Sequence, residues 1–139
     1  MPVATVLIKI STKGNDDVVD ITSKVAEIVS GSKMKSGLVN IFVSGSTASV
    51  TTIEYEPGLI RDIKRLGERI APSDEDYSHN DTWGDGNGHS HIRASVIGPS
   101  LTVPFTAGKM ALGTWQQIVV IDHDTSARSR DIVVKIMGE

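Results

Sequence analysis

The chain has 139 residues, of which 39% are hydrophobic and 22% are charged, and its net charge is -3 at pH 7. A chain of this length and composition can bury a hydrophobic core, so we expect a single domain over residues 1–139 rather than a disordered chain. The negative charge argues against nucleic acid as a partner, because binding to a phosphate backbone requires a basic surface. The absence of cysteine excludes disulfide bonds and thiolate metal sites.

The sequence also lacks the signals that direct a protein to or through a membrane. The first residues, MPVATVLIKI, have neither the basic start nor the small-residue cleavage site of a signal peptide. No apolar run approaches the roughly 20 residues that span a bilayer. We therefore expect a cytoplasmic protein that makes no membrane contact.

The first third of the chain predicts three strands and one helix. Residues 3–11 are rich in β-branched types, which is typical of a strand. Apolar residues recur at helical spacing over residues 20–32. Two further strands are expected at 38–45 and 48–55, and the Gly45-Ser46 turn between them suggests a hairpin.

A second helix is expected between Pro57 and Pro72. Proline is tolerated in a first helical turn, and a second proline would end the helix. An apolar stripe runs along this segment, made by Leu59, Ile60, Ile63, Leu66 and Ile70. The charged residues between these positions are interpreted as a solvated face.

Four more strands are predicted in the second half, at 90–98, 101–105, 114–124 and 131–138. The resulting order does not alternate strand with helix, so a doubly wound parallel sheet fits poorly. We expect an α+β domain built on a mostly antiparallel sheet or sandwich with two helices.

Residues 79–91, HNDTWGDGNGHSH, contain three of the four histidines. If a strand begins near Gly88, its period of two places His89, His91 and Arg93 on one face, with Ile92 turned toward the core. A His-x-His pair can bind zinc or a similar metal, and His79 or Asp85 could complete the ligand shell. The alternative is that these histidines are hydrogen-bonded polar residues on a solvated sheet face.

Three arginines are candidates for binding a phosphate. Arg93 would need either an anionic ligand or a carboxylate neighbour, for which Asp122 and Asp124 are available. Arg128 and Arg130, two residues apart, could grip a phosphate together, or they could be surface charges of an exposed turn.

Two polar residues elsewhere have open roles. Glu54 follows an apolar strand and could be a helix-start charge, a metal ligand or a general base. Gln116 precedes another apolar strand, and its amide could be satisfied internally or could hydrogen-bond a heterocyclic or phosphorylated ligand.

Several motifs occur together in a specific order: Asp85-Gly86-Asn87-Gly88-His89-Ser90-His91, then Gly98-Pro99-Ser100, then Leu112-Gly113-Thr114-Trp115-Gln116-Gln117-Ile118. In this the chain resembles the YjbQ-like family, which is known as a secondary thiamine-phosphate synthase. The resemblance implies a small α+β subunit that forms a homotrimer. It also implies a polar pocket around the histidines, near a subunit interface, with a bound divalent metal such as zinc or magnesium.

The resemblance also assigns roles to individual residues. Metal ligands would be His79, His89 and His91, and the catalytic group would comprise His91, Arg128, Asp85 and Glu54. Asn87, Arg93, Gln116 and Arg130 would bind substrate. One departure from the family pattern is Gly45, which stands where many relatives have histidine.

The implied activity joins a hydroxymethylpyrimidine diphosphate to a thiazole phosphate and releases pyrophosphate. Its diphosphate would leave in a largely dissociative step, which the protein would support by positioning and by neutralising charge. Two alternatives remain: a metal-dependent hydrolase that uses a His/Asp-bound water, and a non-catalytic trimer that binds a phosphorylated metabolite or a metal.

Overall fold

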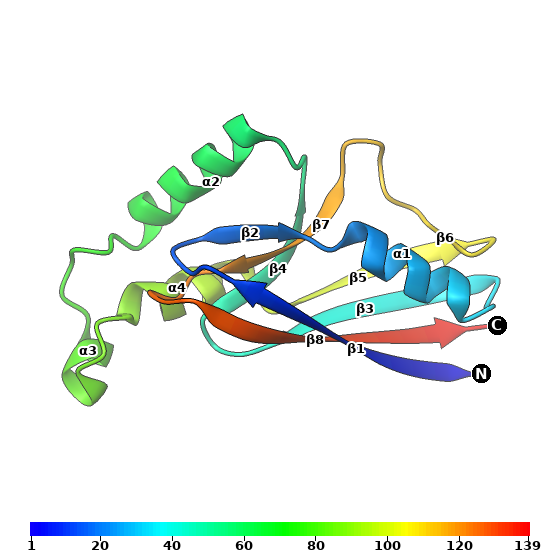
Figure 1. Cartoon of the computed structure of the whole chain (residues 1–139), viewed down its shortest axis with the longest axis horizontal. Helices are drawn as coiled ribbons and strands as arrows, with labels where there is room; N and C mark the ends of the chain where they lie inside the picture. The colour runs from blue at the N-terminus through cyan, green and yellow to red at the C-terminus, as the bar shows by residue number, and fades with distance from the viewer.

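A computed structural model describes residues 1–139 as eight strands and four helices (Figure 1). The strands are β1 (Val3–Thr12), β2 (Asp17–Asp20), β3 (Ser36–Ser44), β4 (Ala48–Ile53), β5 (Ser100–Thr106), β6 (Lys109–Met110), β7 (Gln117–Asp122) and β8 (Arg128–Gly138). The helices are α1 (Thr22–Gly31), α2 (Pro57–Ile70), α3 (Ser78–Trp83) and α4 (Gly88–Ile97). None of the helices combines the length and the hydrophobicity that a bilayer crossing requires.

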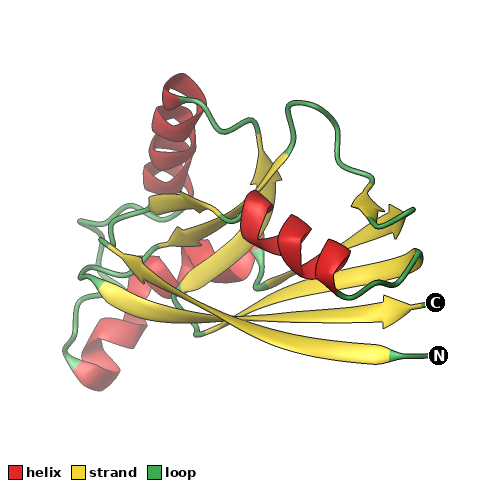
Figure 2. Ribbon diagram, turned by 45° about the vertical axis from the view of Figure 1, so that its right-hand side comes forward, coloured by secondary structure: helices red, strands yellow, loops and turns green.

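The strands form two antiparallel sheets. One has five strands in the order β1-β8-β3-β5-β6, and the other has three in the order β2-β7-β4. The main core lies between the inner face of the five-stranded sheet and a second layer made of α1 and one face of the three-stranded sheet (Figure 2). A smaller cluster, centred on Val18, Val119 and Ile121, lies on the other face of the three-stranded sheet, toward α2 and α4.

These observations confirm the predicted α+β domain with mostly antiparallel sheets. Both expected helices are present within a few residues of the predicted bounds, and so are the strands expected at 3–11, 101–105 and 131–138. The structure has four helices rather than two, because α3 and α4 were not predicted. Two short strands, β2 and β6, were also missed, since four and two residues are too few to show a period.

The predicted hairpin between the segments 38–45 and 48–55 is wrong. Both segments are strands, but β3 pairs with β5 and β8, whereas β4 pairs with β7 in the other sheet. Gly45, with φ of 144°, redirects the chain from one sheet to the other. Each strand can then bury apolar residues in the shared core from opposite sides, as Val43 and Val50 do.

The predicted strand at 90–98 is also wrong, because this segment is helix α4. The buried positions are Gly88, His89, Ser90, Arg93 and Ala94. His89 and Arg93 are four residues apart, as are Ser90 and Ala94, which is the spacing of one helix face. Ile92 is 39% exposed and does not face a core. Over so short a segment, alternating polar and apolar residues match the period of a strand as well as that of a helix. Only the helix buries His89 and Arg93 together.

A buried ion pair connects the two sheets. Arg130 of β8 donates from Nε and Nη2 to the two carboxylate oxygens of Asp122 at the end of β7, at 2.8 and 2.9 Å. Thr12 of β1 donates to the same carboxylate. Burial pushes the pKa of Asp122 upward, but the hydrogen bonds from Arg130 and Thr12 outweigh it and hold the pKa below the usual carboxyl value.

Removing the carboxylate of this pair should destabilise the fold strongly. We expect Asp122→Ala to lower the free energy of unfolding by about 3–5 kcal/mol, because it removes two hydrogen bonds from the buried Arg130 guanidinium and leaves it only Asp124, 4.0 Å away, as a counter-ion. Asp131→Ala is the matched control, since Asp131 pairs only with exposed Lys9, and should cost no more than about 1 kcal/mol. Urea denaturation measures both variants, and equal losses would contradict this role for Asp122.

Candidate functional site

A cluster of polar side chains lies where the β7–β8 loop meets the loop between α3 and α4. His79 comes from α3, Asp85 and Asn87 from the loop that follows it, and His91 from the second turn of α4. The β7–β8 loop supplies Asp124, and β8 begins with Arg128. We call these six residues the histidine–aspartate cluster.

Asn87 connects the two loops of the cluster. Its side-chain amide lies 3.1 Å from Nε2 of His79 and 3.4 Å from Oδ1 of Asp124. On the other side of His79, Oδ1 of Asp85 lies 3.6 Å from the same Nε2. The His79 ring also packs against the His91 ring, with ring centroids 4.2 Å apart and planes tilted by 50°. Four residues of the predicted site are therefore adjacent in space.

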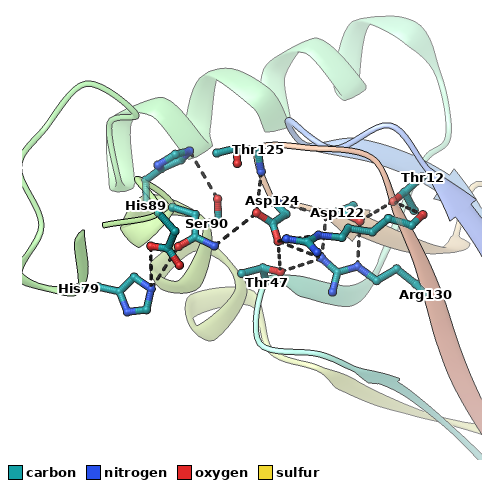
Figure 3. A network of polar contacts seen from close by, with 12 residues as sticks. Thr12, Thr47, His79, His89, Ser90, Asp122, Asp124, Thr125 and Arg130 are labelled. Atoms are coloured by element: carbon teal, nitrogen blue, oxygen red, sulfur yellow. Dashed lines mark hydrogen bonds and ion pairs between the residues drawn. The ribbon is translucent and has the colours of Figure 1, made fainter. Parts of the chain in front are cut away.

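Asp124 anchors the cluster to the sheets (Figure 3). Its carboxylate accepts from Thr47 Oγ1 at 3.0 Å and from Arg128 Nε at 3.1 Å, and the backbone N–H of Thr125 donates to it at 2.8 Å. Burial raises the pKa of Asp124, but the hydrogen bonds from Thr125, Thr47 and Asn87 and the charge of Arg128 bring it below the usual carboxyl value. Asp124 is therefore a carboxylate at neutral pH, and it orients Arg128.

The three histidines proposed as metal ligands do not converge. On helix α4, positions 89 and 91 are about 200° apart around the axis, so the two rings leave opposite sides. His89 is buried beside Tyr77, and its Nδ1 has no hydrogen-bond partner, whereas His91 packs against His79. No group of three or more histidine, aspartate or glutamate side chains is arranged to hold a metal ion.

Arg93 and Arg130 are held by carboxylates within the protein. Arg93 donates to Asp16 at 2.8 Å, to Glu68 at 2.9 Å and to the backbone oxygen of Ala71, so its neighbours are not the Asp122 and Asp124 considered from the sequence. Arg130 is bound by Asp122 and also donates to Thr47. Of the three candidate arginines only Arg128, half of whose side chain is exposed, is accessible to a ligand.

Glu54 and Gln116 lie away from the cluster. In the β4–β7 register Ala48 faces Asp122 and Ile53 faces Gln117, so five residues, about 17 Å of strand, separate the two ends. Gln116 lies beyond the distant end, where its side chain bonds Gly113 and Thr52. Glu54 is exposed there, and the start of α2 is capped instead by Glu56, whose carboxylate accepts from Gly58 and Leu59.

A nucleophile–base arrangement that the sequence did not reveal lies on the other side of α4. Nε2 of His123 is 2.8 Å from Oγ of Ser49, and Nδ1 of His123 is hydrogen-bonded to Asp16. This Ser-His-Asp arrangement resembles the catalytic triad of a serine hydrolase. Ser49 is completely buried, however, so no substrate reaches its hydroxyl, and the chain of bonds is a structural link between β4, β7 and the loop before β2.

Comparison with known proteins decides the family. The model of a family described as UPF0047 protein YjbQ-like matches residues 6–139. The chain belongs to this family. A UPF0047 protein of Methanothermobacter thermautotrophicus is similar over the whole chain, with 37% identity across 139 residues and 95% of the relative covered.

Solved structures of similar proteins have the same fold. A YbjQ-like protein of unknown function from Sulfolobus solfataricus matches with a TM-score of 0.94 and 36% identity, covering 99% of both chains. A hypothetical protein from Aeropyrum pernix matches with a TM-score of 0.91 and 32% identity, covering 98% of this chain and 99% of that one. The YjbQ-like membership predicted from the sequence is thus confirmed, and the activity has to be argued from the site.

The imidazoles of α4 should be neutral at physiological pH. Burial lowers the pKa of His91, and the neighbouring His79 lowers it further; burial and then Arg93 lower the pKa of His89. We expect NMR titration to give both a pKa below 6.5, with that of His91 rising in His79→Asn. Values at or above 6.5 would contradict the burial of these rings.

The same shifts predict how stability depends on pH. A folded-state pKa below the unfolded value means that the unfolded chain binds the proton first, so the free energy of unfolding should fall as pH drops below about 6.5. Replacing His89 by Gln should flatten this dependence in urea denaturation curves measured between pH 5 and 8. An unchanged slope would show that His89 does not contribute.

Proposed function

We propose that the chain is a thiamine-phosphate synthase-like transferase, which joins a hydroxymethylpyrimidine diphosphate to a thiazole phosphate and releases pyrophosphate. The observation that carries the proposal is the histidine–aspartate cluster, in which two imidazoles in contact are connected through Asn87 and Asp124 to one accessible guanidinium. The family resemblance suggests the reaction, and the exposed guanidinium of Arg128 supports it as a candidate group for binding the leaving diphosphate.

In this reaction the bond between the pyrimidine methylene carbon and the diphosphate oxygen breaks, and the thiazole nitrogen bonds to the same carbon. Negative charge builds up on the leaving diphosphate, so the protein contributes mainly by placing cationic and N–H groups around it. Arg128 suits this role because Asp124 engages its Nε and Nη2 on one edge, which leaves Nη1 for a phosphate oxygen.

The remaining residues of the cluster would bind and orient. A neutral His91 can donate one N–H to a diphosphate oxygen. Asn87 is buried between His79 and Asp124, so it would orient these two residues rather than touch the substrate. Asp85 is a half-exposed carboxylate at the rim. A divalent ion would enter with the diphosphate as part of the substrate, since magnesium sites combine one or two carboxylates with substrate phosphates rather than a full protein cage.

A second candidate is non-catalytic binding of a phosphorylated metabolite at the same cluster. Gly45 favours it, because the position where many relatives have a histidine has no imidazole here. A Cβ added at Gly45 would lie 2.6 Å from Nη1 of Arg130, so the guanidinium occupies the space that a side chain would need. With Arg130 fixed there by Asp122, the cluster offers a phosphate one accessible guanidinium.

Replacement of two residues tests the transferase. We expect Arg128→Ala to reduce thiamine phosphate formation by about 100-fold or more, because it removes a charge that acts on the transition state, and His91→Ala to reduce it less. Arg61→Ala, on the exposed face of α2, is the matched control and should leave turnover unchanged.

The same assay separates the two candidates. Near-wild-type turnover in both Arg128→Ala and His91→Ala would remove the assignment of the cluster. A wild-type protein that forms no product but is stabilised against heat by the thiazole phosphate, with the shift lost in Arg128→Ala, would establish the binding protein instead.

We also propose that the chain assembles as a homotrimer, which the family resemblance implies. Support comes from the outer face of the five-stranded sheet, which no helix covers. Leu7, Val133 and Phe42 lie side by side in one row across β1, β8 and β3, and Val3, Met137 and Leu38 form another. Apolar rows of this kind on a sheet face are typical of an interface between subunits.

A charge placed in the middle of this face tests the assembly. Analytical ultracentrifugation should give a mass of three chains for the wild type, and Phe42→Asp should shift it toward one chain, because the carboxylate would be buried without a partner. Trp115→Asp, a change of an exposed aromatic in the segment before β7 of the three-stranded sheet, is the control. A wild-type protein that remains a single chain at high concentration would contradict the proposal.

A further inference from the structure

Helix α2 presents an apolar face that the rest of the protein does not fill. None of its 14 residues is buried, although Ile63, Leu66 and Ile70 form the stripe predicted from the sequence. Leu66 is 47% exposed and Ile70 43% exposed. Figure 1 shows α2 lying over the three-stranded sheet, on the side away from the five-stranded one. A helix with such a stripe normally packs on a core, so its unfilled contact surface needs an explanation.

The space beneath the helix is a cavity of about 240 Å³. Its walls are aliphatic side chains of α2, of α4 and of strands β4 and β7, including Ile53, Val96, Ile97 and Ile121. Its floor is polar, formed by Asp16, Arg93 and His123. A Cβ added at Gly67 would lie 2.9 Å from Asp16 Oδ2, so α2 approaches the floor most closely at this glycine. The cavity is separate from the histidine–aspartate cluster, which lies on the other side of α4.

The polar floor is satisfied without a ligand. Asp16 is bound by His123 and Arg93, and Arg93 is bound further by Glu68 and Ala71. Hydrogen bonds from Arg93 and Ser73 outweigh burial and lower the pKa of Glu68 to about 2, so its carboxylate stays charged beside Arg93. A ligand charge buried on this floor would find no free partner and would be costly. The interior of the cavity therefore suits an uncharged, apolar group.

A groove that carries two arginines adjoins the cavity. Arg65 and Arg69, four residues apart on α2, form a shallow groove with Asp62 and Leu66, and Leu66 lines both the groove and the cavity. Arg65 pairs with Asp62, whereas Arg69 makes no ion pair or hydrogen bond. Because Leu66 lines both spaces, the Arg69 guanidinium is near enough to the cavity to meet an anionic group at its mouth.

We propose that this cavity binds the apolar chain of an anionic amphiphile, a medium-length acyl or alkyl chain that carries a carboxylate or a phosphate. The chain lies among the aliphatic walls, and the anionic head lies beside Arg69. An engineered cavity of about 150 Å³ holds one benzene molecule, so the larger volume here has room for a chain of about eight to ten carbons. The walls are mainly aliphatic, with Thr51 and Thr52 as the polar exceptions, and they fit a flexible chain better than a flat ring.

Binding of decanoate to the purified full-length chain tests the proposal by calorimetry and by NMR shifts of Ile63 and Val96. We expect saturable binding of one decanoate per chain, with decanol weaker and decyltrimethylammonium weaker still. Leu66→Trp should weaken decanoate binding about tenfold or more by filling the cavity. Arg69→Gln should weaken it about two- to fivefold, the usual effect of an exposed ion pair, and should leave decanol unchanged.

The control is Ile92→Trp, which also replaces an aliphatic residue by tryptophan, at a partly exposed position of α4 that does not line the cavity. This variant should bind decanoate as the wild type does. Thermal unfolding of each variant shows that it is folded. Unsaturable binding, or equal affinity in Leu66→Trp and Ile92→Trp, would overturn the proposal.

Two other occupants of the α2 face are distinguished in the same series. Vesicles of phosphatidylglycerol that bind the chain while free decanoate does not would show a membrane-surface helix instead. A smaller assembly mass for Leu66→Trp than for Ile92→Trp would show that a second copy of the chain fills the cavity. Either result would exclude the amphiphile.

Discussion

The ion pair between Asp122 and Arg130 is the contact on which the arrangement of the two sheets depends. It joins the end of β7 to β8 inside the protein, where neither charge is accessible to water. Because the guanidinium also bonds Thr47 at the start of β4, the pair aligns strands of both sheets at one end of the molecule. A buried pair of this kind adds little net stability compared with apolar residues, but it permits few alternative arrangements of its partners.

The histidine–aspartate cluster lies next to the Asp122–Arg130 ion pair and depends on it for its position. Asp124 follows Asp122 by two residues, and its backbone N–H donates to the Asp122 carboxylate at 3.0 Å. Thr47 binds Asp124 as well as Arg130, so the residue that orients Arg128 is itself held from two sides. The position of the one accessible guanidinium is thus linked, through three side chains, to the packing of the sheets. Hydrogen bonds that hold the residue behind a binding group keep the geometry of the binding group rigid.

Helix α4 divides the molecule into two chemically different regions. His91 on one side belongs to the cluster, where charged groups reach the surface. Arg93 on the other side closes the floor of the aliphatic cavity under α2, where every charge is paired within the protein. One ten-residue helix can serve both regions because successive side chains leave it about 100° apart. The proposed phosphorylated substrate would bind in the first region, and the apolar chain of the proposed amphiphile would bind in the second.

Local pattern in the sequence was sufficient for the strands with long β-branched runs, for α1 and α2, and for the grouping of His79, Asp85, Asn87 and His91, which are close in the chain. It was not sufficient for α4, because a segment of ten residues can match both the strand period of two and the helix period of 3.6. Nor could it show that Arg93 bonds Asp16, 77 positions away, or that β3 and β4 enter different sheets. Those pairings follow from which charges and strands are buried together, and burial is a property of the whole fold. The sequence by itself determined the longer strands, helices α1 and α2 and the family, because these follow from local pattern. Only the tertiary structure decided which of the three candidate arginines is exposed, because burial depends on residues far apart in the chain.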